Sequence, residues 1–268
     1  MLIVVKIGGD LIEDRLHENL VNDLLSLKSE HVFILVHGGG DKVTDISTRL
    51  GHPPIFITSP DGFRSRYTDK EESKIFTMVM AGLINKQIVS ELGSQGMSVV
   101  GISGLDARLL TASRKRQLII INEKGRKQLI EGGYTGKIKE IDTRILRLLL
   151  ENGITPVIAP VALSEEFEPL NVDGDRVAAS IASILNADYL ILLTDVNGIM
   201  MGGTLIEELN TIEAKELIKE LGPGMKSKVH AAINAVEKGV KEVIIASGLS
   251  YHPIKWSMDH KECTVIKR

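Results

Sequence analysis

Two glycine-bearing segments near the start of the chain have the residue types of a phosphate site. An apolar run at the N-terminus ends in Lys6, Gly8 and Gly9, and the apolar run 32–36 is followed by His37 and three glycines. Glycine lets backbone N–H groups approach an anion closely, and a lysine supplies positive charge. Two buried strands that end in this way would form two walls of a phosphate-binding site. We interpret His37 itself as a structural partner near the turn and not as a base.

Two later segments bring acids and further lysines to expected helix starts. Asn171, Asp173 and Asp175 precede an apolar helical pattern, and a glycine-flanked turn places Lys226 and Lys228 on the first turn of another helix. Asn and Asp favour the N-cap position, but two acids so close together exceed what capping requires, which predicts a functional role for Asp175. Lysines at a helix start oppose the helix dipole, and a bound phosphate would reverse that cost. The alternative for the lysines is a solvated pair.

Together these four segments have what phosphoryl transfer needs. Such a transfer depends on positioning and charge neutralisation more than on covalent help from the protein. Lysines would flank the transferred group, glycine amides would hold its oxygens, and an acid would hold the lysines in place. The Walker sequence and the protein-kinase motifs are absent, and the glycines after His37 lack the spacing of a dinucleotide-binding fold.

Composition excludes several other classes of protein. The chain has 268 residues, of which 43% are hydrophobic, so disorder is not expected. Its 32 Lys and Arg against 35 Asp and Glu give a net charge of −3, which argues against general nucleic-acid binding. Cys263 is the only cysteine and excludes an internal disulfide framework or a Cys-rich zinc site. No apolar run is expected to reach membrane-spanning length and no signal peptide is apparent, so a soluble, cytoplasmic protein is expected.

Apolar strand patterns alternate with helical patterns along most of the chain, which predicts an α/β fold with a mainly parallel sheet and sites at the carboxyl ends of strands. A long helix is expected over 69–92 and hairpins within 108–140. Buried strands are expected at 155–159 and 189–194, and an edge strand at 264–266. The pattern restarts near residue 171. We therefore expect two closely packed lobes, 1–170 and 171–268.

At this point the chain resembles the amino acid kinase family over nearly its whole length. The matching motifs are Lys6-Ile7-Gly8-Gly9, His37-Gly38-Gly39-Gly40, Asn171 through Asp175, Leu193-Thr194-Asp195-Val196-Asn197-Gly198 and Gly224-Met225-Lys226-Ser227-Lys228. Within the family it is most similar to the N-acetylglutamate kinase branch, because Arg66-Tyr67-Thr68 precedes Asn85-Lys86 by the spacing of that branch. The resemblance implies a three-layer αβα sandwich of the carbamate kinase-like type. It also implies an N-terminal acyl-amino-acid substrate lobe that dimerises and a C-terminal nucleotide-binding lobe.

The resemblance implies a role for each matching position. Lys6 and Lys228 resemble the lysines that stabilise the migrating phosphoryl group, and Asp175 resembles the acid that orients them. The residues that resemble the substrate-binding set are Gly39, Gly40, Arg66 and Asn171. Those that resemble the nucleotide-binding set are Lys6, Gly8, Gly9, Thr194, Asp195, Gly198, Met225 and Lys226. The implied cofactors are ATP and Mg²⁺, with no metal ligand contributed by the protein.

Extra basic residues separate this chain from ordinary acetylglutamate kinases. They are Arg64, Arg108, Arg114, Lys115 and Arg116. In this the chain looks like relatives that phosphorylate the side-chain carboxylate of 2-aminoadipate, and in some cases glutamate, held on a small acidic carrier protein of the LysW type. Their acyl phosphate product serves lysine or arginine biosynthesis. The resemblance thus implies such a carrier as partner, a homodimer, and no nucleic acid or membrane partner. The alternatives are a kinase of free N-acetylglutamate, a non-catalytic amino-acid-sensing relative, and a merely solvated basic surface.

Overall fold

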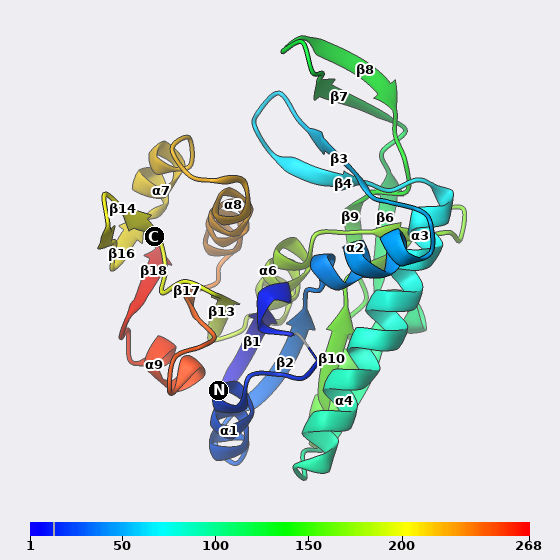
Figure 1. Ribbon diagram of the computed structural model, residues 1–268. Coiled ribbons are helices and arrows are strands. Elements are labelled where there is room, and N and C mark those ends of the chain that lie inside the picture. Colours follow the sequence, from blue (N-terminus) through cyan, green and yellow to red (C-terminus); the bar gives the residue numbers. More distant parts are fainter. Residues whose placement is uncertain (13) are drawn as a thin grey trace.

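A central sheet of eight strands organises the computed structural model, which describes residues 1–12 and 14–268 (Figure 1). In spatial order the strands are β16 (Glu208–Asn210), β18 (Cys263–Lys267), β17 (Glu242–Ser247), β13 (Tyr189–Thr194), β1 (Leu2–Ile7), β2 (Val32–His37), β10 (Thr155–Ala159) and β5 (Val99–Ser103). Neighbouring strands are parallel except β17 and β18, which are antiparallel. This confirms the predicted mainly parallel sheet.

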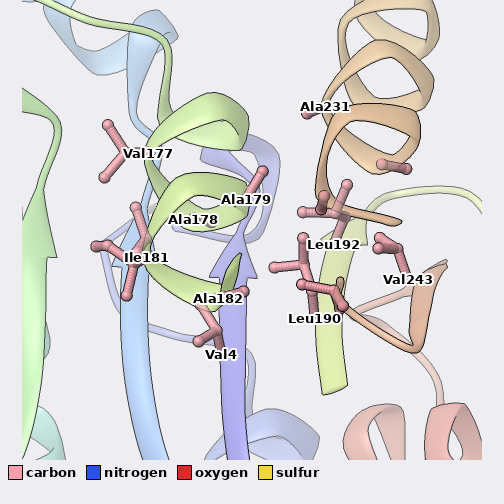
Figure 2. Packing of buried hydrophobic residues seen from close by; sticks show 14 of the residues in the cluster. Val4, Val177, Ala178, Ala179, Ile181, Ala182, Leu190, Leu192, Ala231 and Val243 are labelled. Atoms are coloured by element: carbon pink, nitrogen blue, oxygen red, sulfur yellow. The ribbon is translucent and has the colours of Figure 1, made fainter. Parts of the chain in front are cut away.

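Both faces of this sheet are buried, which is why its strands are almost continuously apolar. Val4 and Leu192 belong to a core cluster on one face, whereas Ile3, Val5 and Ile191 belong to the cluster on the other, as the alternation of side chains along a strand requires. Figure 2 shows part of the first cluster, in which residues of one helix lie over strands of the sheet.

Helices cover the two faces and complete the predicted three-layer αβα sandwich (Figure 1). The first cluster includes side chains from α5 (Arg144–Glu151), α6 (Gly174–Leu185), α7 (Thr211–Leu217) and α8 (Pro223–Glu237). The second includes side chains from α1 (Glu18–Leu27), α2 (Gly40–Arg49), α3 (Lys70–Thr77), α4 (Asn85–Ser94) and α9 (Pro253–Met258). Single 3₁₀ turns occur at Gly9–Leu11 and Asp106–Arg108.

A continuous helical stretch, Lys70–Ser94, joins α3 to α4 through a π-helical segment, Met78–Ile84. By length and composition alone this stretch is long and apolar enough to cross a membrane, which corrects the expectation that no apolar run reaches that length. The same test is passed by core helices of globular proteins. Here Ile75, Phe76 and Ile88 pack in the core cluster on one face of the sheet, as a core helix does.

Smaller sheets stand beyond the carboxyl ends of the central strands. A four-stranded sheet has the order β12 (Pro169–Asn171), β11 (Val161–Leu163), β6 (Leu110–Arg114), β9 (Gly136–Ile141). The two-stranded sheets are β3 (Ile55–Thr58) with β4 (Arg64–Tyr67), β7 (Gln117–Ile121) with β8 (Lys127–Glu131), and β14 (Met200–Met201) with β15 (Thr204–Leu205). The hairpins β3–β4 and β7–β8 project side by side at the top of Figure 1. The expected hairpin strands within 108–140 are thus present, and the β3–β4 hairpin was not predicted.

Two element predictions need correction. The strand at 264–266 is β18, which lies one place in from the edge because β16 pairs with its outer side. Helix α8 begins at Pro223, so Lys226 lies in its first turn and Lys228 in its second. The expected lobes each supply four neighbouring strands, and β1 and β13 join them through five registered residue pairs. The division at 170/171 itself stays a prediction.

Candidate active site

Three side chains that are far apart in the sequence meet at the carboxyl edge of the central sheet. Lys6 lies near the end of β1, Asp175 in the first turn of α6 and Lys228 in the second turn of α8. The Lys6 Nζ lies 3.0 Å from Asp175 Oδ1, and the Lys228 Nζ lies 3.5 Å from Asp175 Oδ2. All three side chains are nearly buried, with exposed fractions of 9%, 6% and 12% respectively. One carboxylate therefore fixes two cations in one small volume.

The electrostatics of this group favour the charged forms of Asp175 and Lys6. Burial alone would raise the pKa of Asp175, but Lys6 and Lys228 outweigh it and hold the pKa below its ordinary value. Burial likewise opposes the charge on Lys6, but Asp175 raises the Lys6 pKa above its ordinary value. Two positive charges and one negative one leave the group with one net positive charge. A group with this net charge suits the binding of an anion.

The two predicted glycine walls are in contact, backbone to backbone. A Cβ atom on Gly38 would lie 2.8 Å from the Gly9 nitrogen, and one on Gly9 would lie 3.0 Å from the Gly39 nitrogen. Gly39 has φ +143°, and a Cβ there would lie 2.2 Å from Ile84, so only glycine fits. Helix α2 begins at Gly40. Its free N–H groups, the bare glycine backbone and the nearby Lys6 form a cradle whose donors suit phosphate oxygens.

Of the two neighbouring acids, one caps a helix and the other binds the lysines. The Asp173 side chain accepts a hydrogen bond of 2.8 Å from the Arg176 backbone N–H at the start of α6. Its second oxygen accepts a 3.0 Å bond from the Ser227 hydroxyl on α8. Asp173 therefore links the starts of the helices that carry Asp175 and Lys228. Sequence reasoning missed Ser227, whose only signal was its position between two lysines.

Arg66, the expected carboxylate binder, is already held by protein groups. Its guanidinium lies 2.7 Å from Glu72 and donates to the Gly40 carbonyl at 2.8 Å and the Thr44 hydroxyl at 2.7 Å. Glu72 is buried and also accepts a bond from Ser47. Three contacts leave part of the five-donor fork for a ligand. Sequence reasoning missed Glu72, because it faces Arg66 from a different element.

A cavity of about 1110 Å³ opens between the β3–β4 hairpin, β9, α6 and α8. Its lining includes Arg66, Asn171, Asp175 and Lys228, which joins the predicted substrate residues to two members of the lysine–carboxylate group. The Asn171 amide donates to the Thr68 hydroxyl at 3.0 Å. Gly39, Gly40 and Lys6 are outside this lining. The two glycines belong to the cradle, and Lys6 precedes Ile7, which is paired with His37 in the sheet.

The predicted nucleotide residues lie outside the lining of this cavity, and several of them lie at or beside the end of β13. Thr194 ends that strand and is buried, and its hydroxyl donates to the exposed Asp195 at 3.1 Å. A Cβ on Gly198 would lie 2.5 Å from the Thr264 hydroxyl oxygen. Gly8 donates its N–H to the Leu193 carbonyl at 3.0 Å, so the first glycine wall adjoins β13. Met225 is half-buried against the core.

The remaining predicted nucleotide residue, Lys226, reaches from α8 to the β3–β4 turn. Its Nζ is 3.4 Å from the Asp61 carbonyl and 5.8 Å from the Phe63 ring centroid, both in the β3–β4 turn. The pKa of Asp10, the residue after Gly9, is raised by partial burial and by the carboxylates of Asp195 and Asp41. In residues 1–12 and 14–268, no group of three or more His, Cys, Asp or Glu side chains is placed to hold a metal ion.

The predicted carrier-contact residues do not form one uniform surface. Arg114 stacks 3.9 Å from the Tyr134 ring centroid and donates to the Gly133 carbonyl, and Arg116 pairs with Glu166 at 2.7 Å. Arg108 lies 5.6 Å from the exposed Phe167 ring. The other two residues line the cavity: exposed Arg64, over the Phe56 ring at 4.6 Å, and half-buried Lys115. Burial and the neighbouring Arg176 lower the pKa of Lys115.

Comparison with known proteins identifies the class to which this fold and site belong. Residues 1–247 match the model of the amino acid kinase family. The crystal structure of smu.665 from Streptococcus mutans superposes with a TM-score of 0.79 at 25% identity and covers 91% of this chain and 94% of that one. Carbamate kinase from Giardia lamblia bound to AMP-PNP superposes with a TM-score of 0.68 over 99% of this chain and 98% of that one, and at 15% identity this is a likeness of fold alone.

A curated relative narrows the comparison. The [LysW]-aminoadipate/[LysW]-glutamate kinase of Saccharolobus solfataricus is 48% identical over 254 residues, which make up 94% of this chain and 95% of the relative. This chain belongs to the amino acid kinase family.

Proposed function

We propose that this protein is an ATP-dependent kinase that phosphorylates the side-chain carboxylate of 2-aminoadipate or glutamate while the amino acid is linked to a small acidic carrier protein of the LysW type. The observation that carries the kinase activity is the buried Lys6–Asp175–Lys228 group beside two facing glycine segments. Two observations support the assignment of the substrate: the name of the Saccharolobus solfataricus relative and the basic residues that line the cavity. The product is an acyl phosphate for lysine or arginine biosynthesis.

The chemistry requires neutralised charge and alignment and no general base. The acceptor carboxylate is already ionised near neutral pH, so it can attack phosphorus without losing a proton. ATP would supply the phosphoryl group, and Mg²⁺ would add positive charge at its phosphates, with no protein ligand to the ion assigned. Lys6 and Lys228 neutralise the oxygens of the transferred group, and Asp175 holds the two ammonium groups at their working distance. The backbone N–H groups of the glycine segments supply further donors.

On the substrate side, Arg66 would bind the α-carboxylate of the amino acid and Asn171 would bind the acyl group. Gly39 and Gly40 would lie beside the reacting carboxylate. Glu72 and Thr44 fix the guanidinium before a substrate arrives, which lowers the entropy cost of binding. On the nucleotide side, the residues that would bind ATP are Lys6, Gly8, Gly9, Thr194, Asp195, Gly198, Met225 and Lys226.

The carrier-linked substrate is favoured over free N-acetylglutamate by the cations of the cavity. Besides Arg66, Lys228 and Arg64, its lining includes Lys115, Lys137 and Arg176. These cations would attract an acidic partner that carries the amino acid. Arg64, Arg108, Arg114 and Arg116 complete the proposed contact surface.

One kinetic comparison tests the identity of the substrate. The protein is given ATP with carrier-bound aminoadipate, carrier-bound glutamate or free N-acetylglutamate, and kcat/KM is compared. We expect both carrier-linked substrates to exceed the free one. Higher kcat/KM with free N-acetylglutamate would make that compound the substrate, and no transfer to any of the three would leave the sensing relative as the better description.

Three further features belong to the same proposal. They are a division into lobes 1–170 and 171–268, a homodimer formed through the first lobe, and a cytoplasmic location. Light scattering coupled to size-exclusion chromatography measures the oligomer directly, with a mass near twice the 29.3 kDa of one chain expected.

A further inference from the structure

His37 is buried at the end of β2, immediately before the glycine segment of the cradle, and the mechanism above gives it no task. Its side chain is fully buried, and its Nδ1 lies 2.9 Å from the carbonyl oxygen of Gly38. Its Nε2 lies 3.3 Å from the amide nitrogen of Asn85, which is also fully buried, at the start of α4. The imidazole therefore stands between a glycine carbonyl and an asparagine amide.

The surroundings of Asn85 fix which way its amide faces. Its Nδ2 donates to the Val157 carbonyl at 2.9 Å and lies 3.4 Å from the Ile102 carbonyl, and its Oδ1 accepts from the Lys86 ammonium at 3.0 Å. A reversed amide would place an oxygen against a carbonyl and a nitrogen against a cation. The fold also makes room for this amide, because a Cβ on Gly101 would lie 2.0 Å from Asn85 Oδ1. The amide nitrogen is thus the group that faces His37.

The orientation of Asn85 then fixes the proton on His37. Because the Asn85 amide nitrogen is a donor, the His37 Nε2 that faces it must accept, and a neutral imidazole with an accepting Nε2 carries its proton on Nδ1. That Nδ1–H donates to the Gly38 carbonyl. Burial, with Lys6 and Lys86 nearby, lowers the pKa of His37 to about 4, so the ring stays neutral.

Holding the Gly38 carbonyl determines the direction of the next N–H group. In a trans peptide the C=O and N–H bonds point in opposite directions, so the Gly39 N–H points away from His37. The Gly39 nitrogen lies next to Gly9, where a Cβ atom on Gly9 would be 3.0 Å from it. In the part of the chain that the structure describes, the Gly39 N–H has no hydrogen-bond acceptor. A glycine pair would otherwise rotate this peptide at little cost.

We infer that His37 is a positioning residue: its Nδ1–H, set by Asn85, clamps the Gly38–Gly39 peptide so that the Gly39 N–H faces the phosphate cradle. The expected effect on kcat rests on the proposed function. The expected tautomer of His37 rests only on the buried hydrogen bonds of His37 and Asn85. The two consequences are measured separately.

The structural test is long-range ¹H–¹⁵N NMR on the ligand-free protein with labelled histidine. The His37 signals are assigned by their loss in His37→Asn. We expect a neutral ring protonated at Nδ1 that does not titrate between pH 8 and pH 5. A ring protonated at Nε2, or one that titrates in the ordinary range of histidine, overturns the inference. This readout needs no substrate, so it holds or fails whatever the enzyme phosphorylates.

The kinetic test uses two variants that each keep one half of the imidazole. The Asn side chain of His37→Asn can place an N–H near the Nδ1 position, whereas the Gln side chain of His37→Gln places its polar atoms near the Nε2 position. We expect His37→Asn to retain most of kcat, and His37→Gln to lose kcat by about 10²-fold, the usual cost of one misplaced oxyanion donor, with a smaller change in the KM for ATP. Equal kcat in two variants that melt at the same temperature overturns the positioning role. A variant that fails to fold is replaced by Asn85→Ser, for which the NMR experiment must then show a changed tautomer.

Discussion

The two lysines of the candidate site share one carboxylate but differ in what else holds them. Lys6 lies in a strand at the centre of the sheet, whereas Lys228 lies on a helix whose start is linked to α6 through Asp173 and Ser227. We expect Lys6→Ala and Lys228→Ala each to lower kcat by about 10²–10³-fold, because each removes a preorganised charge from the transferred group. Steady-state kinetics and nucleotide titration separate this loss from weaker ATP binding.

Lys226 provides the matched comparison for these lysines on the same helix. Its Nζ contacts the β3–β4 turn instead of Asp175, so Lys226→Ala should change the KM for ATP more than kcat. Near-normal kcat in Lys6→Ala or Lys228→Ala would remove that lysine from the mechanism.

Asp175 should act as an organiser whose charge does not titrate at working pH. Its pKa is held below the ordinary 3.8, so the stability it contributes is present above that value and is lost as the pH falls through the lower folded-state pKa. The pKa of Lys6 is raised above 10.5, so its contribution is complete below 10.5 and is lost only at higher pH. Asp175→Asn should therefore lower kcat at every pH without removing an acidic limb from the pH–rate profile.

The same variant should change acid unfolding in a defined direction. Urea unfolding of the natural protein should show stability falling as the pH drops below 3.8, and in Asp175→Asn that part of the fall should be smaller. A pH–rate profile that loses its acidic limb in Asp175→Asn, with both lysines unmoved, would instead indicate a base.

At the scale of elements, the starts of α6 and α8 act as one unit. Asp173 caps α6 and accepts from Ser227 on α8, so Asp173→Ala should cost about 1–2 kcal/mol of stability through the lost cap. It should also lower kcat, because the two helices carry Asp175 and Lys228. Chemical denaturation and kinetics on the same preparations measure both effects.

Asn210 supplies the control for this variant. It caps α7 through a capping box, and α7 carries none of the candidate site residues. Asn210→Ala should therefore lose a similar stability while kcat stays unchanged. If both cap variants lower kcat alike, the effect of Asp173→Ala is general destabilisation and not a displaced lysine.

How far the sequence predicted these elements depends on the kind of signal. Strands β10 and β13 were predicted with the bounds they have, because each is an apolar run with flanking breaks, Gly153 and Pro160 for β10 and Asp188 and Asp195 for β13. The β3–β4 hairpin was missed because its second strand, Arg64–Tyr67, is mostly polar and exposed. Lys228 was expected on the first turn of its helix because Gly222-Pro223-Gly224 has the composition of a turn, but proline suits the first helical position and α8 begins at Pro223.

The sequence predicted those site residues that have a local signal and missed the partners that only packing brings together. Lys6, Asp175 and Lys228 stood out by residue type beside glycine or a helix start, and the structure brings them together. Pairs such as Arg66 with Glu72, and His37 with Asn85, depend on how separate elements pack. Nothing in their local sequence marks them as partners, so tertiary structure was needed to find them.

At the scale of the whole molecule, the proposed partner is tested by the charges around the cavity. Arg64 and Lys115 line it without a carboxylate partner among the ion pairs of residues 1–12 and 14–268, unlike Arg114 and Arg116, which pair with Glu168 and Glu166. We therefore expect the double variant Arg64→Glu/Lys115→Glu to weaken docking of an acidic carrier. Charges at the rim of an interface act mainly on association rate and salt dependence.

The KM for the carrier-linked substrate should rise by about tenfold or more at low salt, equivalent to at least about 1.4 kcal/mol. The rise should shrink as ionic strength brings the Debye length toward ~8 Å. Arg66→Ala should instead weaken every substrate alike, because it removes the proposed α-carboxylate contact. The control for the Arg64/Lys115 reversal is Lys219→Glu/Lys241→Glu, which reverses two exposed charges outside the cavity lining. It should leave the KM for the carrier-linked substrate unchanged. If the Arg64/Lys115 reversal affects carrier-linked and free substrates equally, the carrier contact is wrong and the enzyme acts on a free acylated amino acid.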